Sequence, residues 1–79
     1  MNGIHPELLK QLKEYYKPGS RVKLIQMRDA YTDLRQGDRG TVSFVDDIGS
    51  IHVNWDTGGN LAVLFREDQC VKIEEGELE

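Results

Sequence analysis

Hydrophobic and polar residues alternate most regularly near the middle of the chain, between residues 45 and 64. Every second residue from 51 to 55 is apolar, which predicts a half-buried strand. Ile51, Val53 and Trp55 are expected on its core side, and His52 and Asn54 on its solvent side. The flanking stretches D-D-I-G-S and D-T-G-G-N carry Asp and Gly, which are typical of tight turns.

Four further segments are predicted as strands: Arg21–Met27, Gly40–Asp46, Leu61–Phe65 and Cys70–Ile73. The third of these is continuously apolar, so we expect it to be covered on both faces. The alternation over all five strands predicts twelve inward side chains: Val22, Leu24, Val42, Phe44, Ile51, Val53, Trp55, Leu61, Val63, Phe65, Val71 and Ile73.

A helix is predicted ahead of the strands, from Pro6 to Tyr16. Leu8, Leu9, Leu12, Tyr15 and Tyr16 follow the helical period and form one apolar face. Pro suits the first helical turn, and the Pro-Gly pair at residues 18–19 ends the helix. A helix of this length is marginal alone in water, so its apolar face needs a packing surface. We expect that surface to be its own sheet, with a docking helix for a partner as the alternative.

The length of 79 residues leaves room for a single domain. We expect an N-terminal arm over residues 1–5, the helix over 6–17, a β-domain over 18–73 and a disordered acidic tail over 74–79. The loop from Arg28 to Arg39 is longer than a hairpin requires, and loops of that length are often functional. Five short strands and two tight turns predict a strongly bent antiparallel sheet or a partly open barrel.

Composition favours a cytoplasmic protein without a membrane segment. No apolar run approaches the length that spans a bilayer, and the N-terminus lacks the features of a signal peptide. The single Cys70 has no partner for an internal disulfide, which fits a reducing compartment.

The net charge is −4, and the charged residues are distributed unevenly along the chain. Residues 10–39 hold eight Lys and Arg against four acids, whereas residues 40–79 hold two against nine. The acidic total weakens a nucleic-acid interpretation, because that affinity depends on neutralised phosphates. The basic first half keeps it open as an alternative.

Several segments resemble a family of short proteins from Gram-positive gut bacteria, their phages and their mobile elements, described as domain of unknown function 4314. The resemblance covers residues 15–73 and is most specific at D-D-I-G-S-I-H-V-N-W-D, residues 46–56, with further matches at P-G-S-R-V and G-D-R-G-T-V. The order G-T-V, turn, V-N-W-D also resembles SH3-like barrels of ubiquitin-ligase and Tudor-type modules. These resemblances imply a mainly β fold: a small SH3-like five-stranded antiparallel barrel with one N-terminal α-helix. The family has no assigned activity and implies no catalytic residue.

Motifs for metal binding or catalysis are weak. His5, His52 and Cys70 lack ligand spacing, and no calcium-loop pattern is present. A Cys70–His52 pair is conceivable, but an acidic neighbourhood disfavours the thiolate that catalysis needs. No nucleophile elbow or phosphate-binding glycine motif appears. We therefore expect a non-enzymatic protein with no metal, cofactor or catalytic residue.

A binding or adaptor module with a protein partner is the primary hypothesis. Trp55 could belong to an aromatic cage, but it lies on the same side of its strand as Ile51 and Val53, which places it in the core. Tyr31, His52 and Asn54 are the better surface candidates. A rim of Asp46, Asp47 and Asp56 would favour a basic peptide segment.

The alternative hypothesis is an accessory nucleic-acid-binding protein of a phage or mobile element. Its patch would contain six cations: Lys10, Lys13, Lys17, Arg21, Lys23 and Arg28. Open strand edges can pair between copies, so we expect a monomer or a weak dimer.

Overall fold

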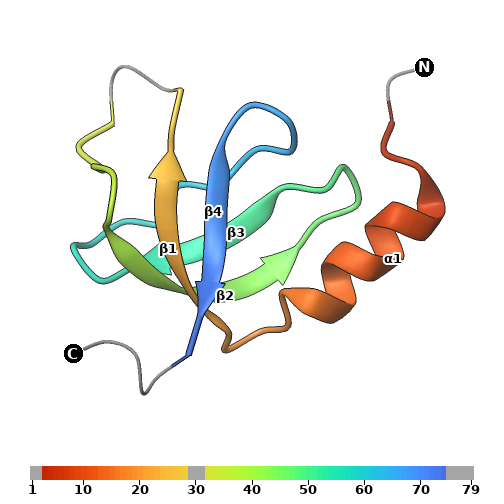
Figure 1. Cartoon of the computed structure of the whole chain (residues 1–79), viewed down its shortest axis with the longest axis horizontal. Coiled ribbons are helices and arrows are strands. Elements are labelled where there is room, and N and C mark those ends of the chain that lie inside the picture. The colour runs from red at the N-terminus through yellow and green to blue at the C-terminus, as the bar shows by residue number, and fades with distance from the viewer. Residues whose placement is uncertain (1–2, 29–31, 75–79) are drawn as a thin grey trace.

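The computed structural model describes residues 3–28 and 32–74. It contains one helix, α1 (Pro6–Tyr15), followed by strands β1 (Arg21–Gln26), β2 (Arg39–Val45), β3 (Ile51–Trp55) and β4 (Gln69–Ile73). The strands form one antiparallel sheet in the order β3-β2-β1-β4, and α1 lies beside it (Figure 1). The predicted mainly β fold with one N-terminal helix is confirmed at this level.

His5, the residue before α1, caps the N-terminus of the helix, a role that the sequence did not indicate. The Nδ1 atom of His5 accepts a hydrogen bond from the backbone N–H of Glu7 at 3.1 Å, and Pro6 occupies the first turn. Leu9, Leu12 and Tyr16 pack against the core cluster of the sheet. The helix therefore covers its own sheet, as expected.

The core lies on one side of the sheet, and its members come mainly from alternating strand positions. Eight apolar side chains are buried: Val22, Leu24, Val42, Val45, Ile51, Val53, Trp55 and Val63. Trp55 lies over a glycine, since a Cβ atom built on Gly40 would be 3.0 Å from Trp55 Cε3 and 2.5 Å from Val53 Cγ1. Gly40 is therefore required for the close approach of the indole to β2.

Five of the twelve predicted core positions lie outside the core cluster: Phe44, Leu61 and Val71 are exposed, and Phe65 and Ile73 are half-buried. Phe44 is 49% exposed because a β-bulge in β2 reverses its side, as described below. Val71 is 42% exposed because it pairs with Lys23 on the outer side of β1, while Cys70 pairs with the buried Leu24. Leu61 is 37% exposed because it lies in a connecting segment, where strand alternation does not apply.

The segment from Leu61 to Phe65 does not form a named strand. Its only β-pairing among the described residues is the isolated bridge between Val63 and Ile51. Leu64 is 42% exposed, so the expectation of cover on both faces is also wrong. The buried Asp68 holds this segment, because its carboxylate accepts backbone N–H groups from Leu64 at 2.9 Å and Arg28 at 2.8 Å.

The remaining boundaries differ from the predictions by one or two residues. The first strand ends at Gln26, the second spans Arg39–Val45 and the last begins at Gln69. Residues 75–79 of the predicted tail lie outside the described part of the chain, as do residues 1–2 of the predicted arm and 29–31 of the long loop. No helix in the described ranges is long and apolar enough to cross a membrane.

Candidate functional site

A β-bulge in β2 creates the most distinctive surface feature of the domain. Val42 pairs with Val53, but the next pair is Phe44 with His52, so one residue of β3 opposes two of β2. Ser43 is the additional residue. Beyond it Val45 turns into the core, opposite the buried Ile51, and Phe44 turns out to solvent.

The ring of Phe44 stacks on the imidazole of His52. The two ring centroids lie 4.3 Å apart, and the planes meet at 7°. His52 Nε2 lies 2.8 Å from Asp46 Oδ2, which fixes the imidazole against the adjacent turn. One face of the Phe44 ring is therefore covered by His52, while about half of the side chain remains in solvent.

Asp46 organises the turn that supports this stack. Its Oδ1 atom accepts backbone N–H groups from Ser50 at 2.9 Å and Ile48 at 3.1 Å. Partial burial raises the pKa of Asp46, but the hydrogen bonds from His52 and from these two N–H groups outweigh it, so the pKa lies below its usual value. Asp46 acts here as a turn-forming residue rather than as a free acidic contact.

Asn54 completes the feature on the same side of the sheet. Its Nδ2 atom donates to Ser43 Oγ at 3.0 Å, across the β2–β3 ladder. We call Ser43, Phe44, His52 and Asn54 the outer-face patch. Two of its members, His52 and Asn54, were predicted from alternation, whereas Ser43 and Phe44 were missed. The adjacent apolar pair Phe44-Val45 breaks the alternation and is the signal that indicates a bulge.

The other two acids of the predicted rim are held in ion pairs within the chain. Asp47 Oδ1 lies 2.8 Å from Lys13 Nζ on α1. Arg21 contacts both carboxylate oxygens of Asp56, at 2.8 and 2.6 Å, and these hydrogen bonds lower the pKa of Asp56. Asp46 and Asp56 also lie at opposite ends of β3, so the three carboxylates do not converge on one ligand.

Tyr31, the remaining predicted contact residue, lies outside the described residues. Within the described ranges, no three His, Cys, Asp or Glu side chains form a group that could hold a metal ion.

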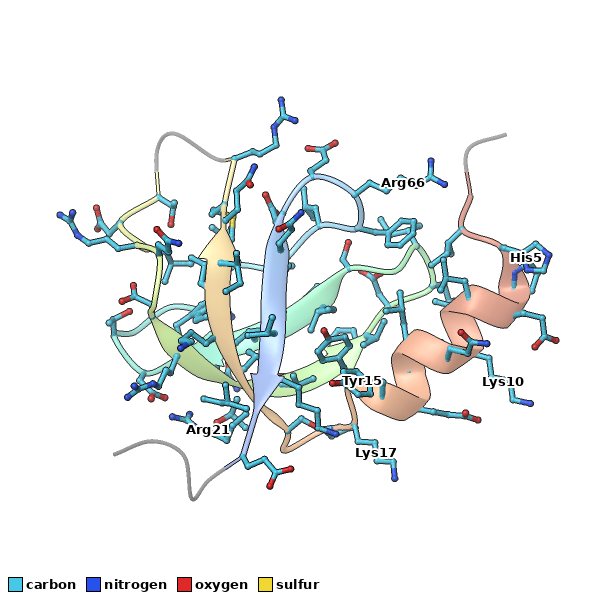
Figure 2. All side chains as sticks on the ribbon, in the orientation of Figure 1. His5, Lys10, Tyr15, Lys17, Arg21 and Arg66 are labelled. Carbon is cyan, nitrogen blue, oxygen red and sulfur yellow. The ribbon has the colours of Figure 1, made fainter. Side chains whose placement is uncertain are left out.

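The six cations of the alternative site do not form one patch. Lys13 and Arg21 are engaged with Asp47 and Asp56. Lys10 extends into solvent from α1 on the side of the molecule away from Arg21, and Lys17 extends into solvent just after the helix (Figure 2). Arg28 follows β1 at the end opposite Arg21, and Lys23 lies between them on the outer side.

Cys70 and His52 are not brought together as a catalytic pair. Cys70 pairs with the buried Leu24 on the core side of the sheet, and His52 lies on the outer side. Burial raises the pKa of the Cys70 thiol to about 11, despite a hydrogen bond with Tyr16 that lowers it. Burial also raises the pKa of Tyr16 to about 12. The thiol is therefore protonated at neutral pH, as a packing residue would be.

Comparison with known proteins identifies a family for this chain. No curated protein and no solved structure matches the chain. A family model described as domain of unknown function (DUF4314) matches residues 5–73, which include α1, all four strands and the outer-face patch. The chain therefore belongs to the DUF4314 family of domains of unknown function.

Proposed function

We propose that this protein is a non-enzymatic binding or adaptor module that contacts a protein partner through the outer-face patch. The observation that carries the proposal is the half-exposed Phe44 ring, held in place by its stack on His52. A large apolar ring on the solvent side of a strand contributes little to the core. Aromatic side chains of this kind are enriched at the centres of protein interfaces.

The local arrangement also supports a preorganised contact. Asp46 fixes His52, and the Ser43–Asn54 hydrogen bond fixes the neighbouring polar side chains. A partner would meet side chains that already occupy defined positions, which reduces the entropy lost on binding. An aliphatic or cationic side chain of the partner can lie against the open face of Phe44.

A protein partner is favoured over nucleic acid because the anchored charge nearest the stack is the carboxylate of Asp46. A phosphate backbone would be repelled there. The alternative function, an accessory nucleic-acid-binding protein, is supported by Lys23 and Arg39, which are cross-strand neighbours on the outer side of β1 and β2. Exposed aromatic rings next to cations are typical of single-strand binding surfaces.

Affinity capture from a lysate of a Gram-positive gut bacterium tests both functions. The baits are the wild-type chain, Phe44→Ala, Asn54→Ala and the control Ile48→Ala, whose side chain is 68% exposed in the adjacent turn. We expect proteins that survive nuclease and high salt to be retained by the wild type and the control, and reduced with Phe44→Ala and Asn54→Ala.

Two results would contradict this proposal. Equal capture by all four baits would remove the outer-face patch as the contact site. Recovery that disappears with nuclease and falls linearly with the logarithm of salt concentration would instead support the nucleic-acid alternative.

The proposal also includes the type of barrel that the strands form and the source of the protein. The sheet order, the long connection between β1 and β2 and the bridge between Ile51 and Val63 are consistent with an SH3-like barrel whose fifth strand is reduced to one pairing. We also propose that the protein is cytoplasmic, because its single cysteine fits a reducing compartment, and that it comes from a bacterium, phage or mobile element, as the family resemblance implies.

A further inference from the structure

Strand β4 forms one edge of the sheet, and its backbone is paired on one side. In β1, the N–H and C=O groups of Leu24 bond to Asp38 and Gly37, toward β2. Because these groups alternate in direction along a strand, those of Arg21 and Lys23 point toward β4. Their partners in the register are Ile73 and Val71.

The groups of Cys70 and Lys72 therefore point away from β1, toward the free edge of β4. Among the described residues, no other segment forms a backbone hydrogen bond with this edge. Unpaired N–H and C=O groups at regular spacing are satisfied by an extended chain, which matches their repeat.

An apolar groove lies between this free edge and α1. In Figure 1, β1 is on one side of β4 and α1 on the other. Its lining includes Leu12 of α1, Tyr16 directly after α1, Ile25 of β1, Cys70 of β4, and the core residues Ile51 and Val63. Leu12 and Tyr16 also line an adjoining groove along α1, together with the exposed side chains of Leu8 and Tyr15. We call this feature the α1–β4 groove.

The position of α1 restricts what can occupy the groove. Lys72 Nζ reaches from β4 to the backbone oxygen of Tyr15 at 3.0 Å and lies 4.8 Å from the centroid of the Tyr15 ring. The helix is thus held across from the strand. A second copy pairing through its own β4 would bring its whole sheet into the place of α1, whereas a single extended segment needs only one strand's width.

The charges along the groove indicate the chemistry of that segment. The ionisable acids that line it are Glu14 and Asp68, and its lining contains no Lys or Arg. Lys72, at its border, is engaged with Tyr15. Acidic residues in the segment would be repelled, and aliphatic side chains at every second position would face Leu12 and Val63.

We propose that the α1–β4 groove binds one extended segment of a partner protein as an added strand beside β4. The segment carries aliphatic side chains at alternate positions and no acidic residues. This site lies apart from the outer-face patch and does not depend on it.

Selection from a phage-displayed library of random linear peptides tests the proposal. The baits are the wild-type chain, Lys72→Pro and the matched control Lys72→Ala. Both variants lose the contact with Tyr15, but only Lys72→Pro loses the N–H that points to the free edge, where proline is tolerated in strands. We expect peptides with alternating aliphatic residues, bound about tenfold more weakly by Lys72→Pro than by Lys72→Ala.

A second measurement uses the wild-type chain alone, so it stands even if Lys72→Pro does not fold. Amide hydrogen exchange at Cys70 and Lys72 should slow when a selected peptide is added, whereas Val71 and Ile73, which already bond to β1, should change little. Phe44→Ala should bind the same peptide with unchanged affinity, which separates this site from the outer-face patch.

Three outcomes would overturn the proposal. The first is that no peptide is enriched on the wild type. The second is a selected peptide that leaves exchange at Cys70 and Lys72 unchanged, or that binds a folded Lys72→Pro as tightly as Lys72→Ala. The third is a free protein that sediments as a dimer with these amides already protected, which would identify a second copy as the occupant.

Discussion

The two sides of the β2–β3 ladder use aromatic residues in opposite ways. On the core side, Trp55 is 4% exposed and its Nε1 atom donates to the carbonyl of Leu61 at 2.8 Å. On the outer side, Phe44 is 49% exposed and stacks on His52. Strand alternation predicts both side chains in the core, so only one of the two was predicted correctly.

The difference between them is a matter of register rather than of hydrophobicity. Trp55 lies in a strand that alternates without interruption, so its parity identifies its side. Phe44 follows Ser43, where the bulge adds one residue and reverses the parity of the strand. An apolar residue beyond a bulge is therefore assigned to the wrong side by alternation alone.

The largest expected effect is the difference between Trp55 and Phe44 in the free energy of unfolding that is lost when each is replaced by Ala. Trp55→Ala should destabilise the fold by about 3–5 kcal/mol, because it leaves a cavity beside Gly40 and the Leu61 carbonyl without its donor. Phe44→Ala should cost about 1 kcal/mol, since half of its side chain is already in solvent. Urea denaturation of both variants measures the difference, and equal losses would show that Phe44 is part of the core.

Gly40→Ala tests the close packing beneath Trp55. A methyl group there would lie 2.5 Å from Val53 Cγ1 and 2.8 Å from the Asn54 carbonyl oxygen, so strands must move apart, at a cost of about 1–3 kcal/mol. Gly3→Ala is the control, because no atom beyond its chain neighbours lies within 4 Å of its added Cβ. Thermal unfolding that is shifted equally in both variants would argue against the tight contact.

A double-mutant cycle sharpens the description of the outer side. Phe44→Ala, His52→Ala and the double variant should reveal a coupling of about 0.5–1.5 kcal/mol, the range for stacked aromatic pairs. Unfolding free energies from denaturant titration measure it. Strictly additive losses would mean that the two rings do not stabilise one another.

The smallest expected effect is the pH dependence of stability that comes from Asp46, in the turn next to the Phe44–His52 stack. The folded-state pKa of Asp46 is lowered from 3.8, so its ionised form stabilises the fold. This contribution is complete above pH 3.8 and is lost as the pH falls through the folded-state pKa. Asp46→Asn should therefore reduce the acid-induced loss of stability, measured by unfolding at pH 2 to 5. An unchanged profile would show that other carboxyl groups, such as Asp56, account for it.

Local elements were predicted well from the sequence where a single periodicity governs a segment. The helix was found from its apolar face, and the alternation from Ile51 to Trp55 correctly placed His52 and Asn54 on the solvent side. Leu61–Phe65 was wrongly predicted as a strand, because an apolar run bounded by turns matches the strand pattern. In the structure this segment makes only one β-bridge, between Val63 and Ile51.

The candidate sites were harder to predict because they depend on pairs that are distant in the chain. Asp47 was interpreted as part of an acidic rim, and in the structure it forms an ion pair with Lys13 on α1, 34 positions away. Arg21 and Asp56 are likewise joined across the sheet. No local pattern reveals which opposite charges meet, so the ion pairs within the acidic rim and the basic patch could not be predicted from the sequence.

The sequence by itself determined the class of the domain, one helix and antiparallel strands, because helix and strand periods are local properties of the chain. Only the tertiary structure decided which side Phe44 occupies, which charges are paired and that β4 presents a free edge to α1 across an apolar groove. These features depend on strand register and on the placement of distant segments. Both are set by the packing of the whole domain rather than by any stretch of residues within it.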